Sequence, residues 1–231
     1  DLCAKKSVKP AFGVELGTVK RLGEKKPTVN YCTFLAKDDI RSINVLVQNA
    51  TRNVGRDPTL LFDYALAAKG VVKIIGERAT FDQLRDIATA SDTYLALSPS
   101  TPKKLAQTAL EVGVKLIATS DNYYPCATDL EFYRVALGKR SNTQTYSMHI
   151  LSDDEWFEAV KYTVSPEQAE DSLRLQKTVL GSLSARMNNA TIYKPQRPKT
   201  LREMCEAGAL RVGIDLNDPV YAQRLELELK V

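Results

Sequence analysis

An aspartate at the end of a short apolar run is the residue of this chain best placed for chemistry. The run from Lys115 to Ala118 ends in Thr119-Ser120-Asp121, a sequence typical of a turn. In α/β proteins, reactive side chains gather where a buried strand passes into a loop at its carboxyl end. Asp121 is therefore a candidate site residue. The alternative is a turn or helix cap, because Asp is favoured there on backbone grounds alone.

A second carboxylate, Glu15, stands in the strand-like segment 11–19. Carboxylates bind hard cations such as Mg²⁺, although an exposed position is the ordinary fate of Glu in a half-buried strand. Glu77 follows another apolar run and is interpreted as solvated. His149 is the single histidine, so a site built from several imidazoles within this chain is excluded. We expect His149 to be a structural or surface residue.

The cysteines give no metal-binding pattern. They stand far apart, at Cys3, Cys32, Cys126 and Cys205, and form no CxxC pair. A zinc site of that type is therefore not expected. Scattered buried thiols in a reducing cytosol are the favoured interpretation, which predicts a cytoplasmic protein.

Length and charge set broad limits on function. The chain has 231 residues, of which 44% are hydrophobic, and its 32 basic and 28 acidic residues give a net charge of +4. This mild excess does not by itself indicate nucleic-acid binding. No apolar run approaches the roughly 20 residues of a membrane span. The chain opens at Asp1 without an apolar signal core, so we expect neither secretion nor a membrane, and we interpret the chain as a fragment of a longer protein.

Periodicity predicts an α/β half followed by a mostly helical half. Strands are predicted over 11–19, 29–36, 70–75, 93–97 and 114–119. Helices are predicted after caps at Asp38 or Asp39, Thr80, Thr101, Ser152, Ser165 and Asp218, and over 129–137 and 200–207. Strands that alternate with helices of about a dozen residues form βαβ units, so part of the sheet should be parallel.

The domain organisation follows from the same pattern. We expect an α/β domain with its helical part over 1–185, and a linker with helices over 186–231. The helix that starts at Ser165 should run to about Met187, and the helix that starts at Thr200 should end before Gly208.

Five segments, read in order, carry a resemblance to a known family. They are 9–16 (KPAFGVEL), 31–47, 114–121 (VKLIATSD), 149–156 (HILSDDEW) and 200–229. Each piece alone is weakly specific, but their order and spacing extend over nearly the whole chain. Together they resemble the N-terminal PHP (polymerase and histidinol phosphatase) domain of bacterial DNA polymerase III alpha subunits.

The resemblance implies a partial, PHP-like distorted (βα) barrel with a helical C-terminal extension. It places two family metal ligands at Glu15 and Asp121, and loosely a third ligand region at Glu77. It also places a ligand histidine of the family at the position of Tyr123, and the family's HxH motif lies upstream of this sequence. The favoured interpretation is thus a degenerate, metal-free site. A single Mg²⁺ or Mn²⁺ ion held by Glu15 and Asp121 is the alternative.

Three functions stay open on this basis. The favoured one is a non-catalytic structural and interaction module acting in DNA replication, with the rest of a DNA polymerase and an exonuclease subunit as partners. The second is a metal-dependent phosphoesterase or 3′–5′ exonuclease. The third is a part of a DNA-directed DNA polymerase whose nucleotidyltransferase residues lie outside this chain, because no Asp-x-Asp pair stands in a plausible palm strand here.

A basic stretch adds a possible DNA contact. It comprises Arg186, Lys194, Arg197, Lys199 and Arg202, with no acidic residue among them in the sequence from 186 to 202. Such a run can contact phosphates. A solvated linker is the favoured interpretation, since no clear aromatic interleaving accompanies the charges.

Overall fold

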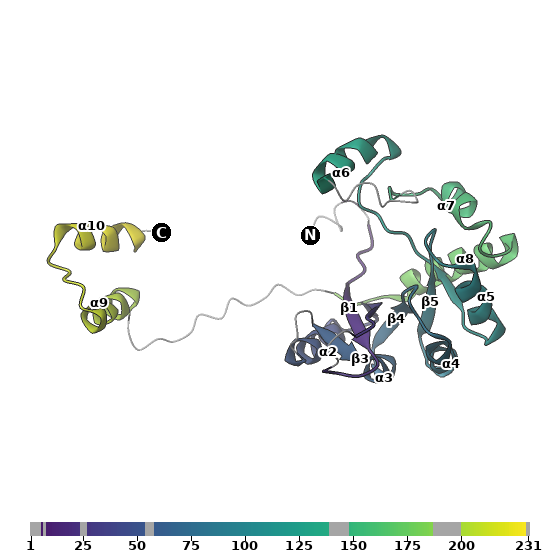
Figure 1. Cartoon of the computed structure of the whole chain (residues 1–231), viewed down its shortest axis with the longest axis horizontal. Helices are drawn as coiled ribbons and strands as arrows, with labels where there is room; N and C mark the ends of the chain where they lie inside the picture. Colours follow the sequence, from purple (N-terminus) through teal and green to yellow (C-terminus); the bar gives the residue numbers. More distant parts are fainter. Residues whose placement is uncertain are drawn as a thin grey trace. The chain divides into compact units, whose positions relative to one another are not determined.

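The computed structural model describes residues 6, 8–23, 27–53, 58–138, 148–186 and 200–229. The chain divides into two compact units, Asp1–Met187 and Asn188–Val231. Figure 1 shows the first unit as a sheet with helices around it and the second as a pair of short helices. The α/β class predicted from the sequence is confirmed. In the described residues, no helix is both long and apolar enough to cross a membrane.

One mixed sheet of six strands organises the first unit. Its order is β3 (Thr59–Leu61), β1 (Gly13–Val19), β2 (Asn30–Ala36), β4 (Val71–Ile75), β5 (Thr93–Leu97) and β6 (Leu116–Ala118). The strands β4, β5 and β6 are parallel, as the βαβ pattern predicts, whereas β2 runs antiparallel to both β1 and β4. Because all strands except β2 run the same way, their carboxyl ends share one edge of the sheet.

The strand β3 was not predicted. It has three residues and pairs in parallel with the end of β1, where Gly17 lies opposite Thr59. A three-residue strand is too short to show an alternation of apolar and polar residues, so its pairing depends on tertiary contacts. The other strands lie within the predicted ranges, although β6 covers only three residues inside its predicted range of 114–119.

Seven α-helices and one 3-10 turn accompany the sheet in the described part of the first unit. They are α2 (Arg41–Arg52), α3 (Phe62–Ala67), α4 (Phe81–Thr89), α5 (Lys103–Glu111), η1 (Ala127–Asp129), α6 (Leu130–Leu137), α7 (Asp153–Val160) and α8 (Pro166–Ser182). The helix α8 ends well before residue 187, so its predicted length was too great.

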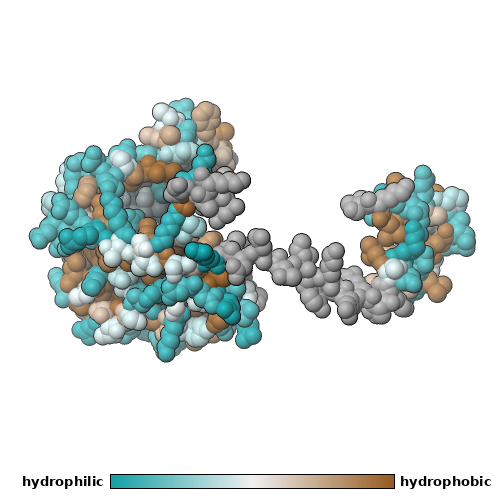
Figure 2. Space-filling view, turned by 180° about the vertical axis from the view of Figure 1, so that it is seen from behind, coloured by the Kyte–Doolittle hydropathy of each residue, from teal (hydrophilic) through white to brown (hydrophobic). Residues whose placement is uncertain are grey.

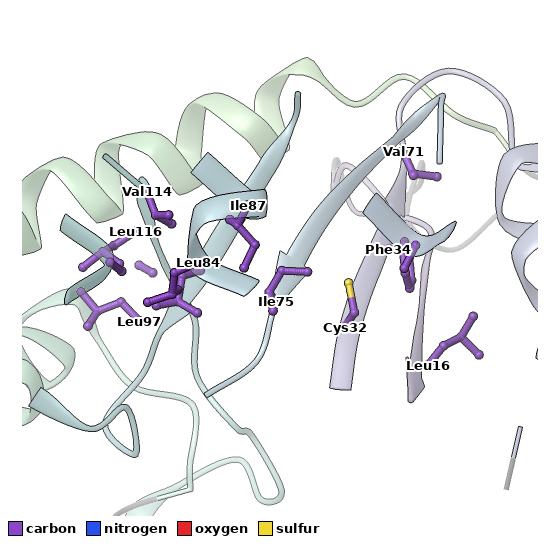
Figure 3. Packing of buried hydrophobic residues seen from close by; sticks show 14 of the residues in the cluster. Leu16, Cys32, Phe34, Val71, Ile75, Leu84, Ile87, Leu97, Val114 and Leu116 are labelled. Atoms are coloured by element: carbon purple, nitrogen blue, oxygen red, sulfur yellow. The ribbon is translucent and has the colours of Figure 1, made fainter. Parts of the chain in front are cut away.

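The main core lies on one face of the sheet. Alternate residues of a strand point to opposite faces, and Cys32, Phe34 and Ala36 of β2 therefore share a face with Leu16 of β1. Figure 3 shows Leu16, Cys32 and Phe34 together with Leu84 and Ile87 of α4, and all five belong to one cluster of buried residues. The hydrophobic cluster on the opposite face of the sheet is smaller. There, Val72 and Ile117 pack against Val179 of α8 and against Leu183, which follows that helix. Helices thus cover both faces of the parallel strands.

Most helix starts follow the predicted caps. Thr80, Ser152 and Ser165 each form a complete capping box with the residue three positions later. Two predicted caps are corrected: Ile40, not Asp38 or Asp39, is the N-cap of α2, and Pro102, not Thr101, is the N-cap of α5. The Thr101 hydroxyl instead accepts a hydrogen bond from Ser98 N–H (2.8 Å) and donates one to Ala96 O (3.2 Å). Thr101 therefore stabilises the loop before α5 rather than the helix itself.

The second unit consists of α9 (Leu201–Val212) and α10 (Pro219–Glu228). The prediction that the first of these helices ends before Gly208 was wrong: the helix continues through this glycine and ends at Gly213, which adopts a left-handed conformation. The guanidinium of Arg202 on α9 pairs with the Glu226 carboxylate on α10 at 2.7 Å. Figure 2 shows apolar and polar residues side by side on the surface of this unit.

Candidate functional site

The carboxyl end of β6 is fixed by a tryptophan. The indole N–H of Trp156, on α7, donates a hydrogen bond to the Thr119 carbonyl at 2.9 Å. The ring is buried in the main core and lies against Phe157. A buried indole needs such an acceptor. The contact therefore holds the first turns of α7 beside the loop that carries Asp121.

The loop after β6 pairs with a second segment. Tyr123 N–H donates to the Met148 carbonyl at 2.8 Å, and Met148 N–H donates to the Tyr124 hydroxyl at 3.2 Å. Tyr124 and His149 form an isolated parallel bridge, and their rings lie stacked with centroids 6.2 Å apart. The segment at 148–150 thus lies beside the loop that follows β6.

The single histidine is a structural residue, in line with its predicted role. His149 is only 7% exposed, and its Nε2 lies 3.2 Å from Oε1 of Glu155. Hydrogen bonds from the Ser152 backbone and hydroxyl, and then from His149, lower the pKa of the Glu155 carboxyl to about 2. Glu155 therefore stays ionised under ordinary conditions and joins the helix cap to the buried imidazole.

Glu15 and Asp121 lie within electrostatic reach of one phenol. Both side chains are exposed. Partial desolvation, then Asp121, Tyr133 and, least, Glu15, raise the pKa of the Tyr123 hydroxyl. Glu15 is in β1 and Asp121 is in the loop after β6. Glu77 is exposed and follows the end of β4.

The described residues include no cluster of three or more metal-binding side chains. No three of their His, Cys, Asp or Glu side chains lie close enough together to hold an ion. Mg²⁺ requires near-octahedral oxygen coordination, and the ligands that suit transition metals are imidazoles and thiolates. Two exposed carboxylates beside a neutral phenol are a poor match for either set.

A cavity of about 330 Å³ lies beside this loop, between the sheet and the helices α7 and α8. Its polar lining comes from Ser120, Asn122, Ser152, Asp153 and Gln176. The Asp153 carboxylate is paired with Lys177 at 2.9 Å. These groups can form hydrogen bonds with a small polar molecule. The Ser152 hydroxyl in this lining donates a hydrogen bond to the Glu155 carboxylate at 2.8 Å.

The sequence analysis missed a buried lysine. Lys73 of β4 is only 2% exposed, and its ammonium donates to the carbonyls of Leu66 (3.0 Å) and Ala68 (3.1 Å) at the end of α3. Burial lowers the pKa of this ammonium. A lysine inside the apolar run Val-Val-Lys-Ile-Ile is the signal that could have identified it.

The prediction that the cysteine thiols are buried holds for only one of the three described cysteines. Cys32 is buried and burial raises its pKa, so its thiol is inert. Cys126, however, is exposed and Cys205 is half-buried, which corrects the expectation of buried thiols throughout. Cys3 lies outside the described residues.

The basic stretch is described at two of its five positions. Arg186 is exposed. Arg202 forms ion pairs with Glu226 and, at 3.9 Å, with Glu206, and these pairs occupy its guanidinium. Lys194, Arg197 and Lys199 lie outside the described residues.

Comparisons with known proteins give no relative from which a function could be transferred. No family model matches this chain, and no curated protein matches it.

Proposed function

We propose that this chain is the PHP-like region of a DNA polymerase III alpha-like protein, and that it acts in cytoplasmic DNA replication as a non-catalytic structural and interaction module. In this role it braces the rest of the polymerase and docks a proofreading exonuclease subunit. The observation that carries the proposal is the position of Tyr123. The sequence resemblance has a histidine ligand at this position, two residues after the family's Asp, and here the position holds a phenol whose pKa is raised by Asp121 and Glu15 among other causes.

The chemistry of Tyr123 favours a loss of catalysis. A phenol with a raised pKa stays protonated at neutral pH, whereas metal ligands bind in their deprotonated form. Negative charge nearby stabilises the protonated phenol further. The group of Glu15, Asp121 and Tyr123 therefore favours hydrogen bonding over metal binding. The partial barrel of the PHP family is part of this proposal. The described strands form one mixed sheet whose end strands are β3 and β6.

A binding experiment tests the interaction role. The full chain is titrated with the purified exonuclease subunit of a bacterial DNA polymerase III by isothermal calorimetry. We expect a saturable heat signal with one exonuclease bound per chain. The proposal would be contradicted if the titration gave no heat of binding and if neither protein changed its sedimentation coefficient in the mixture.

A second candidate function is metal-dependent phosphodiester hydrolysis. The observation that favours it is that Glu15 and Asp121 both contribute to raising the pKa of Tyr123, since carboxylates can hold a cation that activates water. The chain is incubated with 5′-labelled single-stranded DNA and with bis-p-nitrophenyl phosphate, in Mn²⁺, Mg²⁺ or Zn²⁺. We expect no turnover above that of a Glu15→Gln/Asp121→Asn control. Turnover that this double variant abolishes would establish the hydrolase instead. A primer-extension assay on the same preparation should give no product.

A further inference from the structure

The cavity of about 330 Å³ beside α7 and α8 lies where β6 ends. Its lining follows the chain from Ile117 and Ala118 of β6 to Thr119 and Ser120 of the loop. In open α/β sheets, small ligands bind in the crevice at the carboxyl ends of the strands. The volume falls at the lower end of the range of about 300–1,000 Å³ that is typical of small-molecule pockets. Position and size therefore both suit a small organic ligand.

The cavity has apolar walls from the sheet and from a helix. The sheet contributes Leu35, Ile74 and Ile117, one from each of β2, β4 and β6, on the face opposite the main core. The helix α8 contributes Val179 and Leu180. Because Leu35 and Ile74 are only half-buried, the helix does not fully cover this part of the sheet face. A sheet on one side and a helix on the other can hold a flat apolar ring between them.

Two side-chain amides supply hydrogen-bonding groups in the same lining. The half-buried amide of Gln176, on α8, forms no hydrogen bond within the part of the chain that the structure describes. The Asn122 carbonyl oxygen accepts a hydrogen bond from the Ser120 hydroxyl at 3.0 Å, which leaves the Asn122 N–H donors for a ligand. A glutamine amide pairs with adenine through two hydrogen bonds, to the N6 amino group and to N7. Gln176 can therefore recognise the edge of an adenine ring.

The charges around the cavity disfavour an anion. Asp153 lines the cavity, and Asp154 and Glu155 follow it in the first turn of α7. The Asp153 carboxylate pairs with Lys177 through Oδ2 at 2.9 Å, so its other oxygen can accept a hydrogen bond from a ligand hydroxyl. A carboxylate accepts the hydrogen bond of a ribose hydroxyl in dinucleotide-binding folds. The lining thus suits an uncharged ribose rather than a phosphate.

We propose that this cavity binds an uncharged adenine nucleoside. The adenine ring lies between the apolar walls, its edge pairs with Gln176, and a ribose hydroxyl donates to Asp153. The nucleoside site is independent of the polymerase role proposed above, because the described residues of its lining include neither Glu15 nor Tyr123. Failure of the chain to bind an exonuclease would leave the nucleoside site untouched, and failure to bind a nucleoside would leave the polymerase role untouched.

The single tryptophan of the chain reports on occupancy of the cavity. Trp156 lines the cavity, so a bound ring should change its fluorescence. The full chain is titrated with adenosine, with excitation at the long-wavelength edge of the indole absorption, and each titration is repeated by isothermal calorimetry. Purine riboside is the matched ligand, since it lacks the amino group from which Gln176 accepts a hydrogen bond. We expect adenosine to bind about tenfold more tightly than purine riboside.

A matched pair of variants assigns this preference to Gln176. Gln176→Leu should weaken adenosine binding about tenfold and bring adenosine and purine riboside to equal affinity. Gln107→Leu changes an exposed glutamine of α5 outside this lining and should preserve both affinities. A loss of the preference in Gln176→Leu cannot come from unfolding alone, because unfolding would lower both affinities by the same factor.

Adenosine 5′-monophosphate tests the charge of the lining. Its phosphate meets the carboxylates of the first turn of α7, so it should bind about tenfold more weakly than adenosine at low salt, and Asp154→Lys should reduce this difference. The proposal is overturned if adenosine gives neither a fluorescence change nor heat at millimolar concentration, or if the monophosphate binds more tightly than adenosine. Equal binding of purine riboside by the wild-type chain, or an unchanged preference in Gln176→Leu, overturns it as well.

Discussion

The imidazole of His149 and the carboxylate of Glu155 lie 3.2 Å apart, and this contact joins a buried segment to the capping box of α7. Glu155 uses its other oxygen, Oε2, to accept hydrogen bonds from the Ser152 backbone N–H and hydroxyl, both at 2.8 Å. The same helix carries Trp156, which contacts the carbonyl of Thr119. Two neighbouring residues of one helix turn therefore hold the two segments of the candidate site, 119–124 and 148–149, in place.

Glu155→Gln should make unfolding less sensitive to acid. The pKa of Glu155 is about 2 in the folded chain, below its ordinary value of 4.5. A depressed folded-state pKa contributes stability that is fully present above pH 4.5 and is lost as the pH falls through about 2. The wild-type chain should therefore lose its advantage over the variant across this window, as measured by urea midpoints at each pH.

Asp154→Asn is the matched control for this prediction. Asp154 is an exposed carboxylate in the same first turn of α7. Its removal should leave most of the acid dependence in place. Equal flattening of the pH profile in both variants would show that general helix-dipole charge, rather than the contact with Ser152 and His149, lowers the pKa of Glu155.

Lys73→Met should destabilise the chain at neutral pH and remove a rise of stability with pH. The variant leaves the carbonyls of Leu66 and Ala68 without their donor, which costs about 1–3 kcal/mol for a buried unsatisfied group. Burial lowers the pKa of Lys73 below its ordinary 10.5, so the wild-type chain gains stability as the pH rises from the folded toward the unfolded pKa. Denaturant unfolding at several pH values measures both effects. Lys69→Met, at an exposed lysine nearby, should show neither of them.

The sequence predicted the elements that local chemistry determines. The capping boxes at Thr80, Ser152 and Ser165 need only residues three positions apart, and the strand Thr93–Leu97 shows its alternation in five residues. Prediction from the sequence failed where a residue distant in the sequence determines the local structure. β3 forms because β1 lies beside it, and the Thr101 hydroxyl turns back to the strand before it.

The same distinction between local and long-range signals applies to the candidate site. Asp121 could be assigned to a strand end from the pattern alone, because an apolar run followed by a turn is a local signal. The approach of Glu15 to Tyr123 depends on how β1 and the loop after β6 lie in three dimensions. The partner of His149 is likewise set by tertiary packing, although the capping box had already identified Glu155 as a cap residue.

Phe34→Ala should be among the costliest single changes in the main core. Its ring is fully buried between the sheet and its helices, and removal of a buried phenylalanine side chain costs about 3–5 kcal/mol. Phe81→Ala is the matched control, since Phe81 is 50% exposed and contacts the Arg85 guanidinium at its surface. Its cost should stay below about 1 kcal/mol, typical of exposed cation–π contacts. Similar losses of unfolding free energy for both variants would contradict the assignment of Phe34 to the core.

Tyr123→His should convert the neighbourhood of Glu15 and Asp121 into a better metal site. An imidazole is a strong ligand for Zn²⁺ and Mn²⁺, and the two carboxylates would lower the cost of holding the cation. We expect at least tenfold tighter Zn²⁺ binding than in the wild-type chain, measured by equilibrium dialysis with elemental analysis. Tyr31→His, a second exposed tyrosine replaced in the same way, controls for any effect of an added surface imidazole. Equal gains in the two variants would mean that Glu15 and Asp121 contribute nothing to metal binding at position 123, and the loss of the histidine would then not account for a metal-free site.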